Sequence, residues 1–146
     1  MSRENVDAVR SMLEPFTGIN LAEIDLGAEA IRETVERDDA PDVELRTLAS
    51  GIGTGVDALY RGRDGLIRYL QEWLEPFSDY RVDNLDYIEA GDCVLVPTHQ
   101  RGVGAGSGAE VQIELTTLYG LGDGQITRIH QFDTLEEARE APGLSR

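Results

Sequence analysis

Residues 60–82 read YRGRDGLIRYLQEWLEPFSDYRV, and the pattern of apolar residues changes within this stretch. Over residues 63–75 the apolar side chains recur at helical spacing, which predicts one long helix with a wide buried stripe. Pro76 ends this helix because proline cannot continue the helical hydrogen-bonding pattern. From Ser78 onward apolar and polar residues alternate, as is typical of strands. The stretch therefore marks the point where a helical half of the chain gives way to a sheet.

Downstream of this stretch the alternation continues almost to the end of the chain, where a short helix is expected. The expected strands lie near 80–88, 92–103, 110–121 and 125–132. Gly and Asp residues between them, as over 122–124, suit the tight turns of β-hairpins. This half of the chain is thus expected to form an antiparallel meander.

Upstream of this stretch the pattern is mainly helical. A first helix takes Ser2 as its N-cap and kinks or ends near Glu14, because Pro15 follows. The later expected elements are a helix over 28–37, a strand over 43–48 and a glycine-containing loop over 49–62. Helices and one strand followed by an antiparallel meander predict an α+β domain with its helices on one face of a curved sheet.

The composition limits the possible partners. The 146 residues fit one domain over 1–146, and 13 basic against 28 acidic residues give a net charge of −15. Such a charge repels phosphate backbones and anionic membrane surfaces, so we expect no nucleic-acid and no membrane partner. No apolar run approaches the roughly 20 residues that a membrane span needs. The single Cys93 suits a reducing, cytoplasmic location.

Three groups of residues resemble chemical motifs but are better explained as ordinary structure. The glycine clusters over 53–58 and 104–109 lack the helix start that phosphate binding requires, so we predict no nucleotide site. His99 and His130 are not spaced like metal ligands, so we predict no metal and no cofactor. The acidic residues over 38–42 are interpreted as a solvated turn.

Several stretches together resemble one protein family. They are MSRENVDAVRSMLEPF (1–16), APDVELRT (40–47), YRGRDGLIRYLQEWLEPFSDYRV (60–82), IEAGDCVLV (88–96) and LGDGQITRIHQFDTLEEAREAPGL (121–144). The elements YRGxDG, AGDxV and DGxI resemble those of the SnoaL-like polyketide-cyclase family, within the nuclear-transport-factor-2-like superfamily. The resemblance implies a cystatin-like cone, in which the N-terminal helices pack on the concave face of a curved antiparallel sheet and enclose one apolar pocket.

The superfamily contains both enzymes and non-catalytic binding modules, so the pocket residues must decide the function. The resemblance puts the three residues of ketosteroid-isomerase chemistry at Met12, Thr47 and Thr116. Methionine donates no hydrogen bond, and threonine is no base at neutral pH. Isomerase chemistry of that kind is therefore not expected.

Epoxide hydrolases of this fold activate water with an Asp-Arg-Asp set. The resemblance puts residues of that set at Thr98, Gln100 and Gln131, which bind ligands but do not exchange protons. Alternation along the last strand favours Gln131 inward and His130 outward. A register slip by one residue would exchange the two faces and bring His99 and His130 into the pocket.

Glu114 is a further titratable residue expected near the pocket, because it shares a strand face with Thr116. A carboxylate in an apolar cone has a raised pKa and suits a general base, whereas a strand-end Glu facing water does not. The catalytic candidates are Glu114, His130 and His99. The expected pocket residues are Phe16, Thr47, Leu70, Trp73, Thr98, Gln100, Thr116 and Gln131.

Two classes of function follow from this lining. The first is a domain that binds a small hydrophobic molecule without changing it. The alternative is a cyclase, isomerase or hydratase-like enzyme that uses acid/base chemistry on an enolisable, polyketide-like molecule.

A homodimer is also expected. If Glu114 and Thr116 face the cavity, apolar residues cover the outer face of the sheet, and such a face is usually buried against another subunit. These apolar residues are Val111, Ile113, Leu115 and Tyr119.

Overall fold

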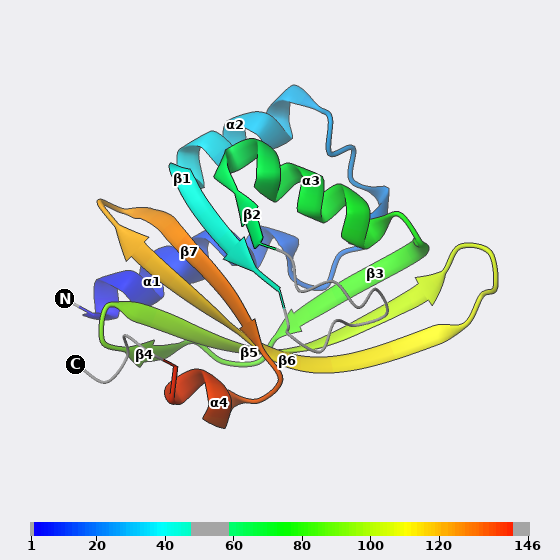
Figure 1. Cartoon of the computed structure of the whole chain (residues 1–146). Coiled ribbons are helices and arrows are strands. Elements are labelled where there is room, and N and C mark those ends of the chain that lie inside the picture. The colour runs from blue at the N-terminus through cyan, green and yellow to red at the C-terminus, as the bar shows by residue number, and fades with distance from the viewer. Residues whose placement is uncertain (1, 48–58, 142–146) are drawn as a thin grey trace.

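The computed structural model describes residues 2–47 and 59–141 (Figure 1). The glycine cluster over 53–58, and most of the loop predicted over 49–62, lie outside the described residues. The helices are α1 (Ser2–Leu13), α2 (Glu29–Asp38), α3 (Gly62–Leu74) and α4 (Leu135–Arg139), with short 3-10 turns at Glu14–Phe16 and Leu21–Glu23. The strands are β1 (Asp39–Arg46), β2 (Leu59–Arg61), β3 (Phe77–Asn84), β4 (Ile88–Ala90), β5 (Cys93–Gly104), β6 (Glu110–Gly122) and β7 (Gln125–Phe132).

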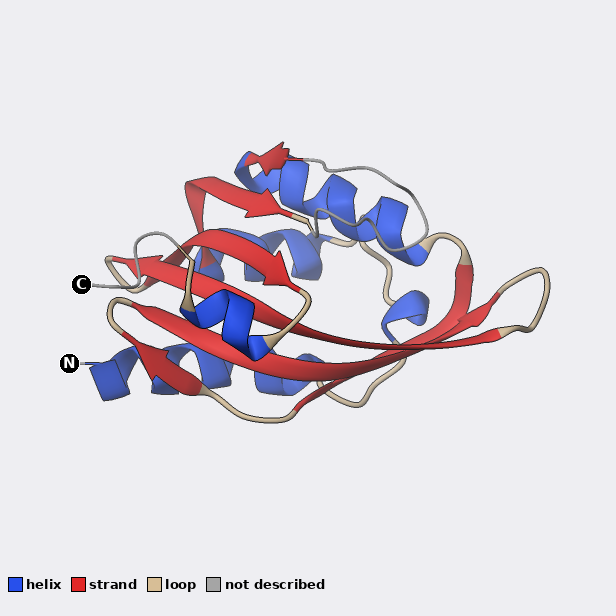
Figure 2. Ribbon diagram, turned by 60° about the horizontal axis from the view of Figure 1, so that its bottom comes forward, coloured by secondary structure: helices blue, strands red, loops and turns tan. Residues whose placement is uncertain are grey.

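The strands form one sheet in the order β2-β1-β7-β6-β5-β3, with β4 pairing beside β3 on β5. The long strands β5 and β6 bend strongly along their length (Figure 2). β1 runs parallel to β7, so the sheet is mixed where the sequence predicts an antiparallel one. β1 and β7 are distant in sequence, and no hairpin turn dictates their relative direction. The predicted α+β cone is otherwise confirmed.

The helices α1, α2 and α3 cover the concave face of the sheet. Val35 of α2 and Leu66 of α3 pack with Ile129 of β7 in one core cluster. Val9 of α1 is fully buried against Val94 of β5 in a second cluster. The short helix α4 instead covers part of the convex face. The concave face is therefore the one on which a pocket can form beneath helices.

The strand predicted over 80–88 is split into β3 and β4. Both pair with β5, but Pro97 lies between the two pairing regions. Proline has no N–H to donate, so the ladder loses a hydrogen bond at that position. The carbonyl of Pro97 still accepts from the Leu85 N–H at 2.8 Å, which holds the connecting segment against β5.

The residues of β6 face the opposite way from the sequence expectation. Thr98 of β5 pairs with Leu115 of β6, and directly paired residues point to the same face. Because Thr98 lines the cavity, Leu115 lies on the concave face as well, while Glu114 and Thr116 lie on the convex face. The side chains of β6 expected in the cavity are therefore on the wrong face, by a shift of one residue. The apolar outer face that supported a homodimer is consequently not formed by the predicted residues.

Candidate functional site

A cavity of about 290 Å³ lies between the three N-terminal helices and the concave face of the sheet. Its lining is mainly apolar and comes from α1, α2, α3 and from five strands of the sheet. A few polar side chains interrupt this lining at separate places. The cavity is near the lower end of the volumes at which proteins bind small organic molecules.

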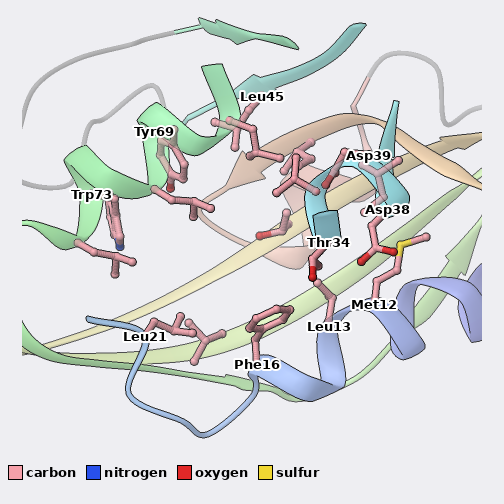
Figure 3. Close-up of a pocket in the computed structure, with 18 of the residues that line it drawn as sticks. Met12, Leu13, Phe16, Leu21, Thr34, Asp38, Asp39, Leu45, Tyr69 and Trp73 are labelled. Carbon is pink, nitrogen blue, oxygen red and sulfur yellow. The ribbon is translucent and has the colours of Figure 1, made fainter. Parts of the chain in front are cut away.

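Aromatic side chains form one wall of the cavity. Tyr69 and Trp73 lie four residues apart on α3, so they project from the same helical face. Their rings are stacked with centroids 6.0 Å apart, and Trp73 meets Tyr80 of β3 edge to face at 5.8 Å. These contacts fix the rings and give the wall a defined shape. Phe16, at the end of the first 3-10 turn, lines the cavity from the side of α1 (Figure 3).

A chain of hydrogen bonds connects the polar residues on the sheet side. The Tyr80 hydroxyl donates to Gln100 Oε1 at 2.6 Å, and Gln100 Nε2 donates to Thr98 Oγ1 at 3.1 Å. Thr98 Oγ1 in turn donates to the carbonyl of Leu115 at 2.9 Å. The network is buried and its members satisfy one another, so it holds the strands β3, β5 and β6 in a fixed arrangement.

The Tyr69 hydroxyl accepts a hydrogen bond from Gln131 Nε2 at 2.8 Å. Burial raises the pKa of the Tyr69 phenol to about 12, while the bond from Gln131 acts in the opposite direction. Burial also raises the pKa of Tyr80 and of Tyr119, which line the same cavity. All three phenols are therefore protonated at neutral pH, so each has a proton to donate in a hydrogen bond and none is a base.

Two carboxylates, Asp38 and Asp39, line the cavity at the end opposite Trp73, near Met12 and Thr34 (Figure 3). Asp38 is the last residue of α2 and Asp39 follows as its C-cap, with the Asp39 N–H bonded to the Val35 carbonyl. The C-terminal end of a helix carries partial negative charge, so acidic side chains are unfavourable there. Stability alone does not explain two acids at this position.

The two carboxylates have different partners. Arg37 binds Asp38 with two hydrogen bonds, from Nε at 2.9 Å and from a terminal nitrogen at 3.3 Å. Within the described residues, no hydrogen bond reaches the carboxyl oxygens of Asp39, although that residue is only 7% exposed. The pKa of Asp39 is raised from its usual 3.8 to about 7. Burial is the largest cause and the charge of Asp38 is the second, while the charge of Arg63 acts in the opposite direction. Asp39 is thus close to half-protonated at neutral pH.

The predicted pocket residues fall into two groups. The residues that line the cavity are Phe16, Leu70, Trp73, Thr98, Gln100 and Gln131. Thr47 and Thr116 are not among the lining residues. Thr47 follows the end of β1, while Thr117 takes the place expected for Thr116 and pairs with Gln131 across β6 and β7.

The three catalytic candidates from the sequence do not line the cavity. Glu114 is 79% exposed on the convex face, where its carboxylate lies 3.6 Å from His99 Nδ1. His130 also lies on that face, opposite Leu118, with its ring 4.2 Å from that of Phe132. These residues therefore cannot act on a molecule held in the cavity.

Sequence reasoning missed Asp38 and Asp39 because a run of acids before a proline is typical of a solvated turn. One signal was available: both acids follow the helical pattern over 28–37 directly, so they stand at a helix C-terminus where acids are unfavourable. The β1–β7 pairing also contains a bulge between Asp39 and Glu44, which shifts the register of β1. The sequence carries no comparable signal for this bulge.

Two absences concern the described residues only. They contain no group of three or more His, Cys, Asp or Glu side chains arranged to hold a metal ion. Among the helices of this part of the chain, none has the length and apolar character of a membrane span.

Comparisons with known proteins agree with this architecture. A putative SnoaL-like polyketide cyclase from Jannaschia sp. CCS1 is 18% identical, with 97% of this chain and 95% of that chain covered and a TM-score of 0.69. TerC, solved with polyporic acid, is 18% identical over 93% of this chain and 95% of that chain, with a TM-score of 0.68. An NTF2-like protein of unknown function from Burkholderia pseudomallei is 20% identical over 92% of this chain and 95% of that chain, with a TM-score of 0.68. Identities this low show a common fold only.

No curated protein matches the chain. The SnoaL-like domain family matches residues 9–129, which is most of the sequence and includes every residue that lines the cavity except Gln131. The chain therefore belongs to the SnoaL-like domain family.

Proposed function

We propose that this domain binds a small hydrophobic molecule with a few hydrogen-bonding groups in the cavity between the helices and the sheet. The observation that carries the proposal is a cavity of about 290 Å³ with apolar walls and separate polar groups. Such a combination is typical of sites that hold small organic ligands. The neighbour TerC was solved with polyporic acid, which supports a small-molecule ligand in a cone of this kind.

Filling the cavity tests this proposal. Trp73 is the sole tryptophan of the chain and lines the cavity, so its fluorescence reports binding of a probe such as cyclohexylmethanol. We expect Thr117→Phe, which adds a ring at the cavity floor, to weaken binding at least about tenfold by occlusion. Gln112→Phe is the matched control, because Gln112 is exposed and points to the other face of the same strand.

Circular dichroism establishes that each variant is folded. If Thr117→Phe does not fold, Met12→Phe narrows the cavity from α1 instead. A folded Thr117→Phe that binds the probe as well as the wild type would contradict the proposal.

A second candidate function is an enzyme that moves a proton on an enolisable small molecule, and Asp39 is the observation that favours it. A buried carboxyl with a pKa of about 7 suits a general base at neutral pH. In this role Asp39 would take a proton next to a carbonyl, and the Tyr69 hydroxyl would donate to the oxygen that becomes negative. The test is turnover of a panel of β-keto and enone compounds by the wild type and by Asp39→Asn. Turnover that the variant retains would contradict this role for Asp39.

A homodimer through the convex sheet face and a cytoplasmic location stay predictions. The exposed Glu114 and the half-buried His99 lie on that face, and α4 covers only another part of it. Light scattering at micromolar concentration measures the mass that decides the oligomeric state.

A further inference from the structure

The charged end of the cavity contains acids without a facing base. Of the described residues that line the cavity, none is Arg, Lys or His, and the charged ones are Asp38 and Asp39. An anionic ligand group would therefore meet like charge at this end and no cation to balance it. A buried charge is stable only when it is paired.

The nearby arginines are already engaged elsewhere. Arg37, whose side chain is 71% exposed, holds Asp38 from the solvent side. Arg63 of α3 donates from Nε to the backbone carbonyl of Asp39 at 2.8 Å and from a terminal nitrogen to that of Glu36 at 2.9 Å. Within the described residues, neither guanidinium donates a hydrogen bond to the Asp39 carboxyl group.

The other groups that face Asp39 supply no positive charge. The pKa of Tyr119 of β6 is raised by burial and by the charge of Asp39, so this phenol stays neutral. Gln125 of β7 donates to the backbone carbonyl of Asp39 at 3.4 Å, not to its carboxyl group. The carboxyl group of Asp39, which lines an apolar cavity beside a second acid, thus lacks a hydrogen-bonded partner among the described residues. The charge of Arg63 only partly offsets the cost of burying its charged form.

We propose that the cavity selects a small hydrophobic amine, whose ammonium group binds the Asp39 carboxylate while its apolar part fills the space toward Trp73. The inference rests on the proposed binding function and names the class of ligand. The ammonium group supplies the hydrogen-bond donor and the positive charge that the cavity lining does not, and charge-assisted hydrogen bonds are among the strongest in proteins. The aromatic wall offers apolar contact to the rest of the molecule.

Binding of an amine should depend on pH in a defined direction. The ammonium group binds the ionised form of Asp39, and that form is favoured above the pKa of about 7. An alkyl amine remains charged throughout this range, as a lysine does. Its dissociation constant should therefore rise about tenfold from pH 8 to pH 6, since the ionised fraction of Asp39 falls about tenfold.

Three probes of similar shape test the proposal: cyclohexylmethylamine, cyclohexylmethanol and cyclohexanecarboxylate. Their dissociation constants are measured by calorimetry and by Trp73 fluorescence at pH 8 and pH 6. At pH 8 we expect the amine to bind about tenfold more tightly than the alcohol, the size of effect that one charge-assisted hydrogen bond provides, and the carboxylate to bind most weakly. The alcohol should show little dependence on pH.

Asp39→Asn should remove both the preference for the amine and its pH dependence, while binding of the alcohol remains. Asp42→Asn is the matched control, because Asp42 is an exposed acid on the same strand. An amine that binds the wild type no better than the alcohol at pH 8, or a preference that survives in Asp39→Asn, overturns the inference and leaves the proposed function intact. Failure of all three probes to bind folded protein overturns both.

Discussion

The two polar regions of the cavity differ in whether their buried polar groups are hydrogen-bonded within the protein. On the sheet side, Tyr80, Gln100 and Thr98 satisfy one another in a continuous hydrogen-bonded chain. At the other end, Asp39 is as buried as Gln100 but receives no hydrogen bond at its carboxyl group within the described residues. The first arrangement stabilises the fold, whereas the second costs stability and remains available for a ligand. The comparison separates the polar residues that stabilise the fold from the one that is available to bind a ligand.

The largest effect is expected from removing the charge of Asp39. Its pKa is raised in the folded state, so its stabilising contribution is complete below about pH 4 and is lost as the pH rises through about 7. Between pH 5 and pH 8 the wild type should lose about 3 kcal/mol of unfolding free energy relative to Asp39→Asn, at about 1.4 kcal/mol for each pH unit up to the folded pKa. Urea denaturation of both proteins at the two pH values, followed by Trp73 fluorescence, measures this difference.

The control for this prediction is Asp42→Asn, which alters an exposed acid on the same strand. Its stability difference from the wild type should stay constant between the two pH values. Parallel pH dependence of the wild type and Asp39→Asn would show that folding does not raise the pKa of Asp39, and the contrast between the two regions would disappear.

A smaller effect is expected from the satisfied region. Tyr80→Phe removes the donor to Gln100 Oε1 and leaves that buried oxygen without its 2.6 Å hydrogen bond. Such a loss costs about 1–3 kcal/mol, because the stranded acceptor is not rehydrated. Unlike the change at Asp39, this cost should be independent of pH between 5 and 8, since the phenol is neutral throughout.

Tyr60→Phe provides the matched control for Tyr80→Phe. Its hydroxyl donates to Glu72 at 2.7 Å, but that bond is exposed and water replaces it. The expected loss is about 0.5 kcal/mol or less. Equal losses of unfolding free energy in the two variants, measured by urea denaturation, would mean that the buried network contributes no more to stability than an exposed hydrogen bond does.

The sequence predicts most of the framework because its signals are local. The apolar stripe over 63–75 and its proline stop correspond to α3, which spans Gly62–Leu74. The turn over 122–124 contains Asp123 and Gly124 with positive φ angles of 55° and 80°, as a tight hairpin requires. In both places, side-chain chemistry and backbone geometry lie within a few residues of each other.

The faces of β6 were assigned wrongly for a different reason. The analogy with isomerase positions put Thr116 in the cavity, although plain alternation puts the apolar Ile113 and Leu115 toward the core. A shift of one residue exchanges every side chain between faces, so a distant analogy is a poor guide to register. Local alternation was the better evidence here.

Asp39 was missed because its character is not local. Its burial depends on α2, α3 and β7 closing around it, and these elements are more than 80 residues apart in places. The position of the acids directly after the helical pattern over 28–37 is the one local signal, and it does not distinguish a solvated acid from a buried one. The pKa of such a group is a property of the assembled cavity, not of its sequence neighbours.

The smallest effect on stability and binding is expected at a third carboxylate, Glu114, which serves as an exposed reference for the two regions of the cavity. Its side chain is 79% exposed on the convex face, and its contact with His99 spans 3.6 Å in water. Exposed pairs of this kind contribute little, so Glu114→Gln should change the unfolding free energy by less than about 0.5 kcal/mol. It should also leave the affinity for cyclohexylmethylamine unchanged, because the sheet separates Glu114 from the cavity. Binding measured by Trp73 fluorescence checks this, with Asp39→Asn measured alongside. A loss of amine affinity in Glu114→Gln as large as that in Asp39→Asn would mean that overall negative charge, not a buried carboxylate at one end of the cavity, attracts the ligand.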